Sequence, residues 1–232
     1  MRHRNGVIPS EARILLLLFF LLPHLAPAQT PPDPVPELTF AEFRALIPSH
    51  AVENPAAAAS VREIFFELLS AQGREAAASQ SLDRLAGWTK AAQARLDAES
   101  APLLDVEMLR FAEAQAGARV ERFEAARLSA SAQINTLLGR EPHAPLRALG
   151  TENSPPDASD LPPEDKLLAS RIARLEQLLS QAQDLLAKVY QNYLFGGVTL
   201  SALLWQEEQT YETELRYRQA LAEAEQFRAR LP

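Results

Sequence analysis

The distribution of proline most constrains what this chain can fold into. The chain has 17 prolines, yet none lies between Pro55 and Pro102, between Pro102 and Pro142, or between Pro163 and Pro232. A proline inside a helix removes a backbone donor and collides with the preceding turn. The three proline-free windows are also rich in Ala, Leu, Glu, Gln and Arg, which are strong helix formers. These windows therefore predict long helices.

Apolar residues within the windows recur at the spacing of a helical seam. The clearest series takes alternating steps of four and three: Leu168, Ile172, Leu175, Leu179, Ala182, Leu186, Val189 and Tyr193. Weaker series of the same rhythm cover residues 61–96 and 106–137, and the last window carries two adjacent seams. This rhythm is typical of helices that pack side by side. We predict an all-α, coiled-coil-like four-helix bundle of two long antiparallel hairpins, with helices at 57–98, 103–139, 164–194 and 199–231. No segment predicts a strand.

The second hairpin requires a tight turn at Gly196, Gly197, Val198 and Thr199. Glycine adopts the left-handed conformation that ends many helices at little steric cost. Thr199 is a suitable N-terminal cap for the helix that follows.

The first hairpin requires a comparable turn at Glu99, Ser100, Ala101 and Pro102. Ser100 is a candidate cap, and Pro102 suits the first turn of the next helix. Superposing the turns places Glu99 on Gly197, and each half then reads as a helix, a short turn and a second helix. This pattern indicates an internal duplication of one hairpin.

The beginning of the chain has the layout of a secretory signal peptide over residues 1–28. A positive start precedes the apolar run Ile14 to Leu22, and Ala26-Pro27-Ala28 supplies small residues at the cleavage site. The apolar run is too short to cross a bilayer. The remaining segments are predicted as a Pro-rich leader and short N-terminal segment (29–56), a first hairpin (57–139), a Pro-rich linker (140–163) and a second hairpin (164–232).

Composition argues against several classes of function. The net charge of −7 disfavours nucleic acid as a partner, and the absence of cysteine excludes disulfides and thiol chemistry. His50 and His143 are far apart in loops, so we predict no catalytic, cofactor-binding or metal site, and no enzyme. The neighbouring carboxylates Glu207/Glu208 and Glu212/Glu214 are interpreted as a solvated helix face.

Aromatic residues are interpreted first as packing residues. Trp88 and Trp205 are expected at helix interfaces. An apolar patch is either core or a subunit contact, and the sequence leaves both open; it consists of Phe65, Phe66, Leu68 and Leu69.

Four stretches, in order, resemble the TolC-like outer membrane efflux protein family. They are LTFAEFRALIPSHAVENP (Leu38 to Pro55), RLDAESAPLLDV (Arg95 to Val106), INTLLGREPHAPL (Ile134 to Leu146) and YLFGGVTLSALLWQEEQTYETELRYRQAL (Tyr193 to Leu221). The first is similar to the family's start, the second and fourth to its two hairpin turns, and the third to the end of its first repeat.

The resemblance implies an efflux function and a trimer with a periplasmic helical tunnel. The eight turn residues Glu99 to Pro102 and Gly196 to Thr199 would then be tip residues that contact a periplasmic adaptor. An exported protein of the periplasm, associated with the outer membrane or with TolC-like subunits, is implied as well. The chain departs from the family in being a short form that lacks the β-barrel strands, and in having Glu99 where a glycine is usual.

Two alternatives remain open at this stage. The chain could be a stand-alone periplasmic coiled-coil protein, structural or chaperone-like, without transport activity. It could also be a soluble binding module that uses the groove between its hairpins.

Overall fold

A computed structural model describes residues 35–47, 55–150 and 163–229. The predicted signal peptide, residues 29–34 and 48–54 of the predicted N-terminal segment, which include His50, residues 151–162 of the predicted linker, and Leu231 lie outside them.

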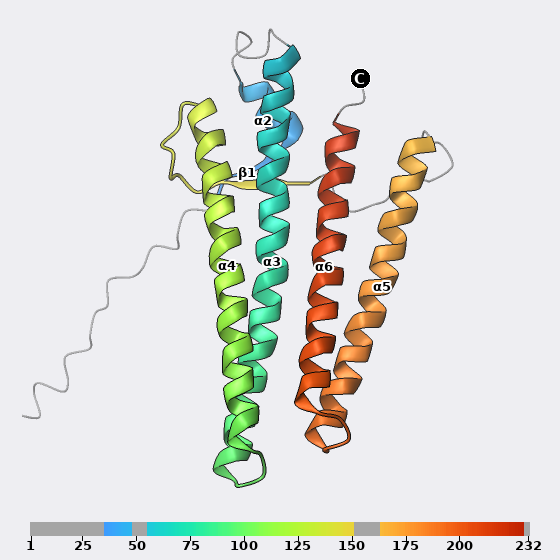
Figure 1. Cartoon of the computed structure of the whole chain (residues 1–232). Coiled ribbons are helices and arrows are strands. Elements are labelled where there is room, and N and C mark those ends of the chain that lie inside the picture. Colours follow the sequence, from blue (N-terminus) through green and yellow to red (C-terminus); the bar gives the residue numbers. More distant parts are fainter. Residues whose placement is uncertain (1–34, 48–54, 151–162, 230–232) are drawn as a thin grey trace, which may run out of the picture. The chain divides into compact units, whose positions relative to one another are not determined.

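Four long helices dominate the described chain (Figure 1). Helices α3 (Pro55–Asp97) and α4 (Leu103–Leu137) form the first hairpin, and α5 (Pro163–Leu194) and α6 (Leu200–Arg228) form the second. The all-α class is confirmed, and the proline-free windows correctly located the helices. No helix among the described residues is long and apolar enough to cross a membrane.

A short helix and two short strands were not predicted. Helix α2 (Phe40–Leu46) begins at Thr39, whose hydroxyl oxygen accepts a bond from the Glu42 amide while the Glu42 carboxylate accepts one from the Thr39 amide. This reciprocal pair is a capping box. Strand β1 (Glu37–Thr39) pairs in parallel with β2 (Arg147–Leu149), with Leu38 opposite Ala148. The prediction of no strand was wrong because three-residue strands are too short to show alternation.

The patch at residues 65–69 belongs to the core. Phe43 of α2 stacks on Phe65 of α3 at 5.4 Å between ring centroids, and Phe40 meets the edge of the same ring at 5.5 Å. Leu146 and Ala148 pack into the same cluster, which we call the N-terminal cluster. The short N-terminal elements and β2 therefore cover a surface that the sequence left as either core or subunit contact.

The two hairpins join through α3 and α6. Each hairpin packs internally, α3 with α4 and α5 with α6, and α3 also packs along α6. The backbones approach closely at Gly73, where a Cβ would lie 3.3 Å from Cβ of Arg218. Near the turns, residues of all four long helices form a second core, the turn-side cluster, which includes Trp88, Leu109, Leu186 and Leu203.

Trp88 fulfils its predicted role, because it is buried and stacks on Tyr190 at 5.1 Å between centroids. The same prediction for Trp205 was wrong, since 65% of its surface is exposed.

Candidate functional site

The two turns have the same backbone geometry. Glu99 has φ 55° and Gly196 has φ 76°. The Glu99 amide donates to Leu96 O at 2.9 Å, and the Gly196 amide donates to Tyr193 O at 3.0 Å. The structure therefore matches Glu99 with Gly196. The pairing with Gly197 expected from the sequence was wrong by one residue.

The helix caps differ between the turns. Thr199 caps α6 as predicted, since its hydroxyl oxygen accepts a bond from the Ala202 amide at 3.3 Å. Ser100 does not cap α4, because its hydroxyl donates backwards to Arg95 O at 3.0 Å. Pro102 is itself the N-cap residue of α4 and has no side-chain capping bond, so it lies just before the helix and not in its first turn, while α4 begins at Leu103 as predicted. In the first turn, the Ser100 side chain therefore bonds to the end of α3 and not to the start of α4.

Most of the predicted tip residues are accessible, and two are not fully so. Glu99, Ser100, Pro102, Gly196, Gly197 and Thr199 are exposed, whereas Ala101 and Val198 are half-buried. Val198 packs against the turn-side cluster. Two large apolar side chains beside the turns are also exposed to water: Phe195 is 86% exposed and Leu103 is 59% exposed.

A contact between the hairpins holds the two turns at the same end of the molecule. The Tyr193 hydroxyl of α5 donates to Asp105 Oδ2 of α4 at 2.7 Å, and the Arg95 guanidinium lies 5.4 Å from the Tyr193 ring centroid. Burial, followed by the Asp105 carboxylate, raises the pKa of Tyr193 to about 12. This bridge was missed from the sequence, because nothing local pairs residues so far apart in the chain.

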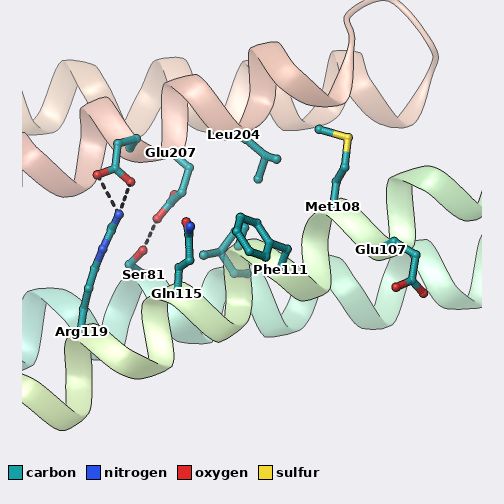
Figure 2. A pocket seen from close by; sticks show the side chains of 11 residues that line it. Ser81, Glu107, Met108, Phe111, Gln115, Arg119, Leu204 and Glu207 are labelled. Carbon is teal, nitrogen blue, oxygen red and sulfur yellow. Dashed lines mark hydrogen bonds and ion pairs between the residues drawn. The ribbon is translucent and has the colours of Figure 1, made fainter.

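A groove of about 390 Å³ lies farther along the bundle, where α3, α4 and α6 meet (Figure 2). Met108 and Phe111 of α4 and Leu204 of α6 give it a large part of its apolar surface. Leu85 and Ala112 add to this surface, and the other residues that line the groove are polar or charged. A soluble binding module would use a groove of this kind between the hairpins, and the sequence indicates no ligand for it.

Both α6 carboxylates at the groove are ion-paired. Glu207 accepts bonds from the Ser81 hydroxyl at 2.8 Å and from Arg84 Nη2 at 2.9 Å. Glu208 is paired with Arg119 Nη2 at 2.8 Å (Figure 2). Each of the two carboxylates therefore has an arginine partner within the chain.

The prediction of a solvated carboxylate face was wrong for two residues. Glu207 is only 3% exposed and Glu214 only 1%, because both face α3 in the joint between the hairpins. Burial raises the pKa of Glu214 above its ordinary value, while Arg218 and Arg84 oppose the shift. The sequence did contain a signal for this burial, because Glu207 and Glu214 lie one heptad apart on a helix that also carries apolar seams.

Within the described residues, no group of three or more His, Cys, Asp or Glu side chains could hold a metal ion. His143 is exposed in the loop after α4. Comparison of the chain with protein-family models, with curated proteins and with solved structures finds no match.

Proposed function

We propose that this chain is a TolC-like helical component of an export system, which binds a periplasmic adaptor through its two hairpin turns. The observation that carries the proposal is the pair of turns with matching backbone geometry, held side by side by Tyr193 and Asp105. Two equivalent turns at one end of a helical bundle provide a repeated docking surface. The sequence resemblance assigns the adaptor contact to these same residues.

The apolar side chains at the turns give this docking surface a chemical basis. Phe195 is 86% exposed and Leu103 is 59% exposed, so neither side chain is buried within the described chain. Large apolar side chains held in water cost free energy that a partner can recover by covering them. The partner would therefore present a complementary apolar surface, as the turn of another helical hairpin does.

The test is an efflux assay in the native host after deletion of the gene. We expect the deletion to increase accumulation of a fluorescent efflux substrate, and the wild-type gene to restore export. A double variant, Leu103→Ser with Phe195→Ser, should not restore export, because it removes apolar contacts at both turns. Leu46→Ser is the matched control, since Leu46 is 59% exposed but lies on α2.

Two outcomes would contradict the proposal. Unchanged accumulation after deletion would favour the stand-alone bundle without transport. Full restoration by the double variant, at equal protein level, would remove the turns as the contact surface.

A further inference from the structure

Three arginines from α3 and α4 meet beside a small aromatic core. Cζ of Arg119 lies 4.7 Å from the centroid of the Tyr211 ring of α6. Cζ of Arg122 and Cζ of Arg74 lie over the ring of Phe123, at 4.7 Å and 5.8 Å from its centroid. Both rings are buried and belong to one cluster. We call these three residues, Arg74, Arg119 and Arg122, the arginine cluster.

The arginine cluster carries more positive charge than the described chain neutralises. Arg119 is paired with Glu208. Within the ranges that the structure describes, Arg74 and Arg122 form no ion pair, and Arg74 donates only to the Ser70 carbonyl oxygen, at 3.4 Å. Contacts with aromatic rings hold guanidinium groups in place but supply no counter-charge. Because guanidinium groups bind oxyanions through charge-assisted hydrogen bonds, the cluster is suited to an anionic ligand.

The arginine cluster adjoins the groove. Arg119 belongs to the cluster and also lines the groove (Figure 2), and Arg122 follows it about one helical turn later on α4. Burial raises the pKa of Tyr211, while the charges of Arg119 and Arg122 oppose this shift. Both guanidinium groups therefore lie near this α6 side chain, and positive charge stands at one end of the groove.

The other part of the groove is mainly apolar. Phe111 is 66% exposed, and its ring lies with Met108 on the α4 side, opposite Leu204 of α6 (Figure 2). Gln115 lies between these side chains and Arg119, and it points towards α6. In the described part of the chain, its side-chain amide forms no hydrogen bond. This amide therefore has a free donor and a free acceptor for a bound molecule.

We propose that the groove and the arginine cluster together bind a small amphipathic acid, with its apolar body between Phe111 and Leu204 and its anionic group at Arg122. The groove volume of about 390 Å³ is in the range of ligand pockets, which are mostly apolar with a few polar groups that fix orientation. Gln115 and Arg122 are about 10 Å apart along the helix axis, so an acid of that length reaches both parts.

The charges of the site disfavour other ligands. Glu207 and Glu208 already have arginine partners, so the groove offers no free carboxylate of α6 to a cation. A simple inorganic anion would leave the Phe111 ring in water. The inference does not rest on the proposed adaptor contact at the turns, and it applies equally to a stand-alone bundle.

Two fluorescent probes that share one apolar body test the proposal. Anilinonaphthalene sulfonate carries an anionic group, and phenylnaphthylamine has the same rings without it. We expect the sulfonate to bind the wild-type protein saturably, with one molecule per chain. The uncharged probe should bind about tenfold more weakly, because it makes no charge-assisted hydrogen bond. Higher salt should weaken binding of the sulfonate more than that of the uncharged probe.

Substitutions separate the two parts of the site. Arg122→Ala should weaken sulfonate binding about tenfold and leave binding of the uncharged probe unchanged. Arg122→Lys should retain part of the affinity, since lysine keeps the charge but not the planar fork. Phe111→Ser should weaken binding of both probes. Arg174→Ala is the matched control, because Arg174 is exposed on α5. Arg122 and Phe111 are exposed as well, so circular dichroism should show unchanged helix content.

Three results would overturn the proposal. The first is equal affinity of the wild-type protein for both probes, which would indicate a groove that receives an uncharged molecule or a partner's helix. The second is sulfonate binding by Arg122→Ala that is as tight as binding by Arg174→Ala. The third is binding of several sulfonate molecules per chain without saturation, which would indicate adsorption to exposed apolar surface.

Discussion

At the scale of single residues, Glu99 is the clearest conflict between local preference and structure. It adopts φ 55°, and it is the one non-glycine residue of the described chain with positive φ. Side chains with a Cβ disfavour this conformation by about 1–2 kcal/mol. Gly196 performs the equivalent role in the second turn with no such cost. The sequence located both turns, because glycine and proline mark breaks in a helical pattern, but it could not show that a glutamate adopts a glycine conformation.

Exchanging the residue types between the turns should change stability in opposite directions. Glu99→Gly should raise the free energy of unfolding by about 0.5–1 kcal/mol, since glycine relieves the strain but increases the entropy of the unfolded chain. Gly196→Ala should lower it by about 1 kcal/mol through the φ angle alone, because an added Cβ meets no atom within 4 Å. Urea unfolding of both variants measures the effect. A loss of stability in Glu99→Gly would show that the Glu99 side chain makes a favourable interaction.

Tyr193 should make stability depend on pH in the alkaline range. Its pKa rises from the ordinary value of 10.0 to about 12 in the folded protein. Between these values the folded chain keeps a proton that the unfolded chain has released, so this contribution is present below pH 10 and is lost as pH rises towards 12. The stability difference between wild type and Tyr193→Phe should therefore shrink across this interval. Urea unfolding at several pH values tests it, and a constant difference would contradict the role of this hydroxyl.

At the scale of elements, the sequence predicted which segments are helical better than which way they face. Proline-free windows and apolar spacing located α3 to α6. Helix α6 contacts both α3 and α5, so its water-facing side is narrow and depends on how the helices cross. As a result Trp205, which was predicted at a helix interface, faces water. Glu207, which was predicted on a solvated face, faces α3.

The Arg84–Glu207 pair should be sensitive to removal of one partner and tolerant of removal of both. Glu207→Ala leaves the Arg84 guanidinium and the Ser81 hydroxyl without their acceptor, which should cost about 2 kcal/mol, because Arg84 is partly exposed. Replacing both, Arg84→Met with Glu207→Leu, should cost less than the single change. A double-mutant cycle of Arg84→Met, Glu207→Leu and the double variant, measured by urea unfolding, gives the coupling. Additive effects of the two substitutions would show that Arg84 and Glu207 do not stabilise the contact between α3 and α6 through their pairing.

At the scale of the whole described chain, the buried residues form separate clusters along α3. The N-terminal cluster lies around Phe43 and Phe65, and the turn-side cluster lies around Trp88 and Leu203. The sequence could not predict that α2 and the β1–β2 pair cover the N-terminal cluster, because these elements depend on contacts between segments distant in the chain. For the same reason the Tyr193–Asp105 bridge and the residues that line the groove were not predicted, whereas the turns were.

Separate clusters should allow local loss of structure. Phe43 is fully buried, so Phe43→Ala should cost about 3–5 kcal/mol. Hydrogen exchange should show faster exchange of backbone amides at residues 61–70, while amides at 200–210 keep their protection. Leu46→Ala is the control, since Leu46 is exposed on the same helix. Equal loss of protection in both regions would instead indicate one cooperative unit.

The pattern of helix contacts also has a consequence for the order of folding. Helix α3 meets α4 across five intervening residues and α5 meets α6 across a similar turn, so most contacts join neighbours in sequence. Such low contact order favours rapid folding. The α3–α4 hairpin can close as soon as residue 137 is available, before the second hairpin has been synthesised. The slower step is then the association of two preformed hairpins along α3 and α6, where the buried carboxylates must find their partners.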